Sequence, residues 1–327
     1  MQVIGVDLGG TKIAVATLRD QDLGDSTIAA TQLANPDQLI DQLVEMVQAA
    51  RSDALDAVGV GVPSVVEFDT GRVVSSVNIP LSDVPLRQVL GDRLGVPVFV
   101  DNDATVAALA ESHDEQLRQI VDDLVMLTIG TGVGGGLVLG GRIYRGAGGG
   151  AGELGHTIVG LDLDQRVAEP GRFPQRGSLE YEASGHALDR LAAQCAERHP
   201  DSQLARSHRG SEPVLGADAV RAAIAGDAAA KKVVEHWGER IGIGVANAIN
   251  TFDPQEVVIG GGAARAGELL LAPARRVAAG YVLPGLGTRT EIRLARHGVR
   301  AGVLGAALLA AHELEASESR PAAGAAR

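Results

Sequence analysis

One arrangement occurs twice in this sequence: a short apolar run, a turn rich in glycine, and a second apolar run. Residues 3–7 and 13–18 flank the first turn, and residues 124–129 and 137–139 flank the second. Apolar runs of this length on either side of a tight turn predict paired strands. The repetition therefore predicts a chain built from two related halves, each with a strand, a glycine turn and a strand.

Strands alternate with helices along the rest of the chain. Apolar residues at helical spacing behind Asn35 and Pro36 predict a helix over residues 37–51. The same patterns predict helices at 104–111, 227–251 and 303–314, strands at 57–62, 96–100 and 256–259, and loops at 160–178 and 198–214. Such alternation is typical of an α/β fold, in which ligands bind beyond the carboxyl ends of the strands.

Composition narrows the classes of function. The 327 residues, 45% of them hydrophobic, are enough for two domains. A net charge of −12 argues against non-specific nucleic-acid binding, because phosphate contacts need clustered Lys and Arg. The single cysteine, Cys195, excludes an intrachain disulfide and a multi-cysteine metal site. The chain has neither a basic N-terminal segment nor an apolar run of membrane-spanning length, so we expect no signal peptide, no membrane span and a cytoplasmic location.

The first glycine turn, residues 7–12, begins with the carboxylate of Asp7 and can form a phosphate-binding site. Its backbone N–H groups can line a concavity that binds phosphate, and the carboxylate of Asp7 can hold Mg²⁺ directly or through water. An ordinary hairpin with a solvent-facing Asp7 is the alternative. In the first interpretation the residues near the phosphates are Gly9, Gly10, Thr11 and Lys12.

The second turn, residues 130–136, holds five glycines in seven positions. Neither turn fits the common phosphate loop or the dinucleotide fingerprint, because a strand rather than a helix follows. Two glycine hairpins in one chain favour a clamp around a nucleotide. A third glycine group, Gly260 to Gly262, follows a strand and either approaches the nucleoside or is a plain strand-to-helix turn.

Asp103 lies at the end of a predicted strand, directly after Asn102. A carboxylate there can orient a hydroxyl that attacks a phosphoryl group and can accept its proton. The competing interpretation is that residues 101–103 only cap the helix that follows. The residues by themselves leave both interpretations open.

Five motifs occur together and in order: DLGGTK at 7–12, VDND at 100–103, GTGVGGG at 130–136, ELGH at 153–156 and LE-x-x-ASG at 179–185. Together they resemble the ROK family of bacterial sugar kinases and sugar-responsive repressors, over roughly residues 1–315. The resemblance implies a two-domain actin-like ATPase (ribonuclease H-like) fold with a cleft between the domains. We expect one domain over 1–112, completed by a C-terminal helix at 300–315, a larger domain over 113–299, and a disordered tail over 316–327.

The resemblance also implies roles for individual residues. Asp103 matches the base that takes the proton of the sugar 6-hydroxyl, and Asn102 and Asn78 match neighbouring sugar contacts. Sugar hydroxyls near the anomeric end would be held by Glu153, His156 and Glu180. The ATP phosphates and nucleoside would be held by Gly9, Gly10, Thr11, Lys12, Gly130, Thr131, Gly132, Gly134, Gly261 and Gly262, with Asp7 on the side of the metal.

The sequence departs from the family at its zinc site. Most members carry C-x-C-G-x-x-G-C before the Leu-Glu, and here residues 171–178 read GRFPQRGS. Without thiolates we expect no zinc site, since one histidine does not make a tetrahedral centre. His156 is then a sugar ligand or a purely structural histidine. We expect Phe173 and Pro174 to pack inward and hold the loop that zinc would order.

The function implied by the resemblance is Mg²⁺- and ATP-dependent phosphorylation of a hexose at the 6-hydroxyl, with glucose as the expected sugar. Kinases for N-acetylglucosamine, N-acetylmannosamine, fructose or allose are alternatives, and polyphosphate is an alternative donor. A sugar-sensing protein without turnover is a further alternative. Family repressors carry a DNA-binding domain before the first glycine turn, whereas that turn begins here at residue 7. The family also implies a homodimer or homotetramer.

Overall fold

The computed structural model describes residues 1–51, 54–76, 78–161, 171–206 and 213–319, which form two compact units. The first unit comprises residues 1–122 and 136–151 together with the chain from Val299 onward. The second comprises residues 123–135 and 152–298. The expected division placed 113–151 in the second domain, whereas 113–122 and 136–151 belong to the first unit, where Gly136 lies against Ala104.

A mixed sheet forms the centre of the first unit, in the order β3-β2-β1-β5-β8 with β4 beside β2. Its strands are β1 (Gln2–Leu8), β2 (Lys12–Arg19), β3 (Asp22–Leu23), β4 (Thr27–Ala30), β5 (Ala57–Val62) and β8 (Val98–Asn102). β1, β5 and β8 run parallel, and Asp7, Gly61 and Asp101 lie in register across them. The carboxyl ends of the three strands therefore share one edge, which carries two of the candidate motifs.

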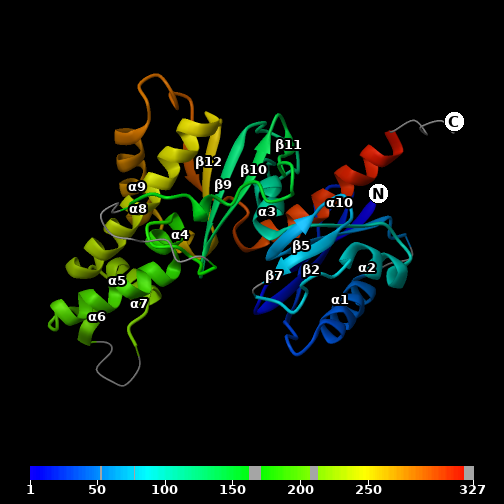
Figure 1. Ribbon diagram of the computed structural model, residues 1–327, viewed down its shortest axis with the longest axis horizontal. Helices are drawn as coiled ribbons and strands as arrows, with labels where there is room; N and C mark the ends of the chain where they lie inside the picture. Colours follow the sequence, from blue (N-terminus) through cyan, green and yellow to red (C-terminus); the bar gives the residue numbers. More distant parts are fainter. Residues whose placement is uncertain (52–53, 77, 162–170, 207–212, 320–327) are drawn as a thin grey trace. The chain divides into compact units, whose positions relative to one another are not determined.

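Helices cover both faces of this sheet (Figure 1), with α1 (Pro36–Ala50) and α2 (Leu86–Leu94) on one face and α3 (Asp103–Glu111) and α10 (Ala301–Ser319) on the other. α1 begins where Oδ1 of Asn35 accepts a 2.9 Å hydrogen bond from the N–H of Gln38. α10 continues to Ser319, past residue 316 where a disordered tail was expected, because Ala and Glu favour helix. Residues 320–327 of that expected tail lie outside the described chain. A small hairpin, β6 (Ser64–Glu67) and β7 (Arg72–Ser76), completes the unit.

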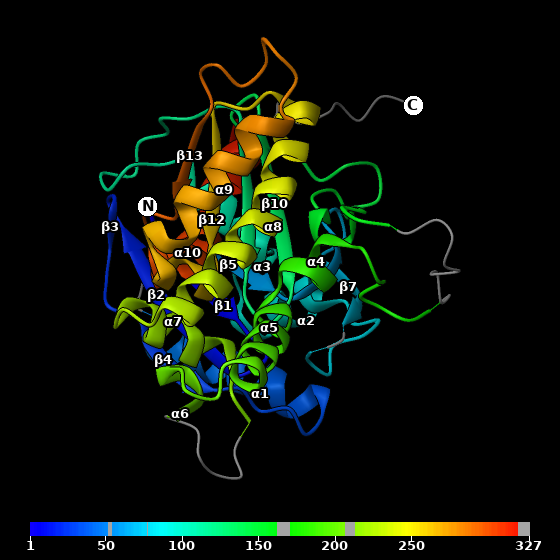
Figure 2. The ribbon, with the colours of Figure 1, turned by 90° about the vertical axis from the view of Figure 1, so that its left-hand side faces the viewer.

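The second sheet has the order β11-β10-β9-β12-β13, where β9, β12 and β13 are parallel. Its strands are β9 (Leu124–Ile129), β10 (Val133–Leu139), β11 (Arg142–Ile143), β12 (Glu256–Gly260) and β13 (Glu291–Leu294). The helical elements of the second unit are η1 (Leu154–His156), α4 (Leu179–Ala183), α5 (Gly185–Arg198), α6 (Gln203–Arg206), α7 (Gly216–Ile224), α8 (Ala228–Phe252), η2 (Gly261–Ala266) and α9 (Glu268–Tyr281). α8 and α9 pack side by side (Figure 2). No helix in the described ranges combines the length and apolar character needed to cross a lipid bilayer.

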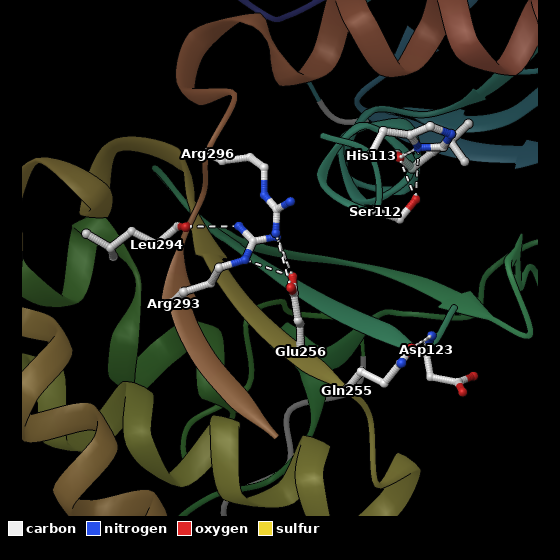
Figure 3. Close-up of polar contacts among 9 residues, drawn as sticks. Ser112, His113, Asp123, Gln255, Glu256, Arg293, Leu294 and Arg296 are labelled. Carbon is white, nitrogen blue, oxygen red and sulfur yellow. Dashed lines mark hydrogen bonds and ion pairs between the residues drawn. The ribbon is translucent and has the colours of Figure 1, made fainter. Parts of the chain in front are cut away.

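A buried ion cluster fixes the edge of the second unit (Figure 3). Glu256, at the start of β12, is 8% exposed and accepts hydrogen bonds of 2.8 and 2.5 Å from Nε and Nη2 of Arg293. Nη2 of Arg296 lies 3.1 Å from both carboxylate oxygens. A buried carboxylate needs a compensating charge, so the two guanidinium groups tie β12 to β13 and to the chain that follows β13.

Candidate functional site

The candidate base lies where β8 ends and α3 begins. Asn102 caps α3: its Oδ1 accepts hydrogen bonds of 2.9 and 3.1 Å from the N–H groups of Ala104 and Thr105. Its side-chain amide donates to the carbonyl oxygen of Ser64 at 3.3 Å. Asp103 is half-buried in the first helical turn, where Oδ1 accepts from the N–H of Ala104 at 2.8 Å. Capping is therefore done chiefly by Asn102, and the role of Asp103 as a base stays a prediction.

An ion network lies beneath this corner. Nε of Arg145 donates to Oδ2 of Asp101 at 2.7 Å, and Nη2 lies 3.3 Å from Oε1 of Glu313 on α10. The side chains of Asp101 and Arg145 are 3% and 20% exposed. Burial raises the pKa of Asp101, and the Arg145 guanidinium and the N–H of Asn102 oppose that rise. The guanidinium also lies over the ring of Phe68, 3.4 Å from its centroid.

The first glycine turn joins β1 to β2 in the same unit. The N–H of Gly9 donates to the carbonyl oxygen of Lys12 at 2.9 Å, which closes the turn. Oγ1 of Thr31 donates to the carbonyl oxygen of Gly9 at 2.7 Å and fixes it from outside. Asn78, which is exposed, lies beside this turn, with its Cβ 3.3 Å from the place where a side chain on Gly10 would begin. The structure thus places Asn78 next to the predicted phosphate residues.

Asp7 immediately precedes this turn. Its carboxylate lies against the start of α10, where a Cβ on Gly302 would be 2.5 Å from Oδ2. Burial raises the pKa of Asp7, and the charge of Lys12 opposes the rise. Within the described ranges the side chain of Asp7 makes no hydrogen bond and no ion pair. A half-buried carboxylate in this condition is a suitable oxygen donor for a hard cation.

The second glycine turn, between β9 and β10, lies in the second unit. The N–H of Gly130 donates to the carbonyl oxygen of Gly132 at 3.0 Å, and the N–H of Gly185 donates to that of Gly130 at 2.7 Å. Oε2 of Glu180, on α4, accepts a hydrogen bond of 2.8 Å from the N–H of Val133. The predicted phosphate turn and a predicted sugar residue are therefore in direct contact.

The two remaining predicted sugar residues lie beside α4. Nε2 of His156 is 3.7 Å from Oε2 of Glu153, and their side chains are 39% and 49% exposed. η1, which carries His156, packs on α4. The contact between η1 and α4 thus brings Glu153 and His156 near the helix that carries Glu180.

The loop before α4 is held differently from the expectation. Phe173 was expected to pack inward, but it is 67% exposed and contacts His156 edge-on, with 5.4 Å between ring centroids. The segment is held mainly by backbone pairing: the N–H of Val159 donates to the carbonyl oxygen of Gly177 at 2.8 Å, and Leu179 to that of Thr157 at 2.9 Å. These backbone hydrogen bonds hold the segment without an inward-packed Phe173. Residues 162–170 lie outside the described chain.

A cavity of about 550 Å³ opens beside the second glycine turn. Gly130, Thr131 and Gly262 line it, whereas Gly261 lies against the backbone of Ile129. The apolar part of its wall comes from side chains that no motif had indicated, among them Leu188, Val220, Ile224, Ala263 and Trp237. Helical periodicity at 216–224 was the available signal for some of them. A largely apolar cavity next to backbone amides can take a flat base joined to a phosphate chain.

Known proteins resemble this chain along nearly its whole length. The model of the ROK family matches residues 3–313. A glucokinase of Halalkalibacterium halodurans is 35% identical over 316 residues, covering 92% of each chain. The crystal structure of a ROK family glucokinase from Streptomyces griseus in complex with glucose and AMPPNP matches with a TM-score of 0.78 at 31% identity, over 95% of this chain and 100% of that one. A ROK family transcriptional regulator, a homologue of the E. coli MLC protein, matches with a TM-score of 0.80 at 28% identity, over 94% and 77%.

Proposed function

Because this chain belongs to the ROK family, we propose that it is an ATP-dependent sugar kinase that phosphorylates glucose at its 6-hydroxyl. The glucokinase likeness over 92% of the chain supports the reaction class. The observation that carries the proposal is the placement of Asp103 at the carboxyl end of β8, at the sheet edge that also carries Asp7 and the first glycine turn. A carboxylate there is suited to accept a hydroxyl proton during phosphoryl transfer.

Each group of candidate residues has its own part in the proposed reaction. Asp103 accepts the proton of the sugar 6-hydroxyl, which raises the nucleophilicity of that oxygen. Asn102 and Asn78 hold the sugar beside it. Glu153, His156 and Glu180 bind hydroxyls at the other end of the ring, and their carboxylates and imidazole discriminate hydroxyls by hydrogen bonding.

Backbone amides of the two glycine turns are proposed to hold the phosphates of ATP. The amides work by preorganisation, since donors fixed by the turns need not reorient as charge develops. The 550 Å³ cavity beside Gly130 and Gly262 is the proposed site of the adenosine. This cavity favours ATP over polyphosphate as donor, because a polyphosphate chain has nothing to place against Trp237 and Ile224.

Asp7 fits a role toward Mg²⁺. In phosphoryl-transfer sites Mg²⁺ is held by one or two carboxylates together with phosphate oxygens and water, and Asp7 supplies one such carboxylate. When bound with ATP, Mg²⁺ neutralises charge that develops on the phosphate oxygens. We also propose a cytoplasmic location, where ATP is supplied, and a homodimer or homotetramer, as the family resemblance implies.

Measuring ADP release with a panel of sugars tests the proposal. Glucose should give the highest kcat/KM among glucose, N-acetylglucosamine, N-acetylmannosamine, fructose and allose. Asp103→Asn should lower kcat by about 10²–10⁴-fold, the usual contribution of a general base, while glucose binding is retained. Asp92→Asn, the same change at an exposed position on α2, should leave kcat unchanged.

Two outcomes would contradict parts of this proposal. Near-normal turnover of Asp103→Asn would remove Asp103 from the role of base. Glucose binding without ADP release in the wild-type protein would instead favour a sugar sensor. The likeness to a transcriptional regulator is the observation that supports this alternative.

A further inference from the structure

The carboxylate of Glu180 and the second glycine turn fit closely together. Oε2 accepts a 2.8 Å hydrogen bond from the N–H of Val133. A Cβ added to Gly132 would lie 2.4 Å from that same oxygen, well inside van der Waals contact. The carboxylate therefore occupies the space that any side chain on Gly132 would need.

The short helix α4 holds the backbone of Glu180 in place. Oγ of Ser178 caps the helix by accepting from the N–H of Tyr181 at 3.2 Å. Leu179 is 1% exposed and lies against α8, where a Cβ on Gly244 would be 2.6 Å from Cδ2. Because the flanking residues are fixed, the carboxylate reaches the turn from a rigid base, as precise positioning requires.

Among the described residues, hydrogen bonds attach the turn to residues 180–185 at two points. At its start, the carbonyl oxygen of Gly130 accepts from the N–H of Gly185 at 2.7 Å. At its end, the N–H of Val133 donates to Glu180. Only the second attachment uses a side chain, so substitution of Glu180 releases one end of the turn without altering the backbone at the other.

We propose that Glu180 is a positioning residue for the nucleotide: it fixes the turn over residues 130–133 so that the remaining amides of the turn face the phosphates. This inference rests on the proposed function and extends it, because the same carboxylate is also a proposed sugar contact. Oε1 makes no hydrogen bond within the described ranges, which leaves it for a sugar hydroxyl. The carboxylate of Glu180 would then contact both the sugar and the turn that holds the ATP phosphates. Binding of sugar would therefore alter the affinity for ATP, and binding of ATP would alter the affinity for sugar.

Charge and hydrogen bonding act in opposite directions at Glu180. The negative charge repels a nearby phosphate, whereas the hydrogen bond to Val133 orders the turn that binds it. Glu180→Gln separates the two effects, because its amide oxygen can still accept from Val133 and the charge is gone. Glu180→Ala removes both and leaves the end of the turn untied.

The test is isothermal titration of each variant with a non-hydrolysable ATP analogue and Mg²⁺, without sugar. Glu180→Ala should raise the Kd about tenfold, the loss expected for a hydrogen bond to a charged acceptor. The Kd of Glu180→Gln should be no more than about threefold higher than that of the wild type, because the hydrogen bond to Val133 is kept. The matched control is Glu182→Ala on the same helix, whose carboxylate pairs with Arg240 at 3.0 Å and which should leave the Kd unchanged.

Gly132→Ala tests the same contact from the other side. Its methyl group would displace the carboxylate, so its Kd should rise as in Glu180→Ala, which keeps the test valid if Glu180→Ala fails to fold. Wild-type affinity in Glu180→Ala or Gly132→Ala, or an equal loss in Glu180→Gln, would overturn the inference and leave the kinase proposal standing. A wild-type protein that binds no analogue would overturn both.

Discussion

Replacing Arg145 by Met should strongly destabilise the first unit. The change leaves the carboxylate of Asp101, which is 3% exposed, without its cation. Breaking a buried ion pair from one side costs about 3–5 kcal/mol. Because Arg145 is itself 20% exposed, we expect the lower end of that range, about 3 kcal/mol.

Arg118 provides a matched comparison on the surface. It pairs with Asp114 at 2.6 Å, a distance close to that of the buried pair, but its own side chain is 69% exposed, while that of Asp114 is 16% exposed. Because the guanidinium of Arg118 stays in water, Arg118→Met should cost much less stability than Arg145→Met. The two substitutions therefore compare a buried arginine, which also contacts Glu313 and the ring of Phe68, with an exposed one.

The loss in Arg145→Met should also depend on pH. Burial already raises the pKa of Asp101, and without the opposing guanidinium the pKa of the folded state rises further. A carboxyl whose pKa is higher in the folded than in the unfolded state destabilises the fold as pH rises above the unfolded value of about 4. The deficit of Arg145→Met should therefore be smaller at pH 5 than at pH 8.

Urea unfolding followed by circular dichroism at pH 5 and pH 8 measures both effects. The double variant Asp101→Asn/Arg145→Met should recover most of the loss at pH 8, because it removes the unpaired charge. Equal costs for Arg145→Met and Arg118→Met, or a deficit independent of pH, would refute the reasoning.

Gly136→Ala should cost about 1–3 kcal/mol of stability, because its Cβ would lie 2.4 Å from the carbonyl oxygen of Ala104. Gly280→Ala, in α9, should instead gain about 0.5–1 kcal/mol, because no atom lies near the place of its Cβ. Urea midpoints check both, and shifts of the same sign would contradict the packing argument. Burial lowers the pKa of His312, with Glu315 and Glu313 opposing. The stability that neutral His312 contributes should be present above its unfolded pKa of about 6.5 and be lost as pH falls below it. In thermal unfolding, the melting temperature of His312→Gln should fall less than that of the wild type between pH 6.5 and 5. An equal fall in the two proteins would rule out His312 as the cause.

The fold class could be predicted from the sequence, and the likeness to solved ROK structures confirms it. Strand 57–62 was predicted at the observed bounds of β5, because its apolar run ends at a proline. β10 begins at Val133, earlier than the predicted start at 137. The prediction assigned Gly134, Gly135 and Gly136 to the turn, whereas all three lie in β10. The missing side chain of Gly136 lets α3 approach closely.

Contacts between distant parts of the sequence could not be predicted. Glu180 meets Val133 across 47 positions and Arg145 meets Asp101 across 44, and neither pair shares a local pattern. Cavity residues on α5 and α7 were missed for a related reason, since their apolar side chains look like ordinary core positions. Motifs indicated where backbone amides and carboxylates lie in the chain, and packing decided which of them meet.

α10 has a consequence for how the protein is made. It packs on β1 and β5 of the first unit, yet its residues, 301–319, are translated after every residue of the second unit. The part of that face which α10 covers, beside α3, therefore stays exposed on the ribosome until residues 301–319 are made, while the later unit already has all its parts. A nascent chain stalled near residue 300 would expose that apolar face to chaperones and proteases.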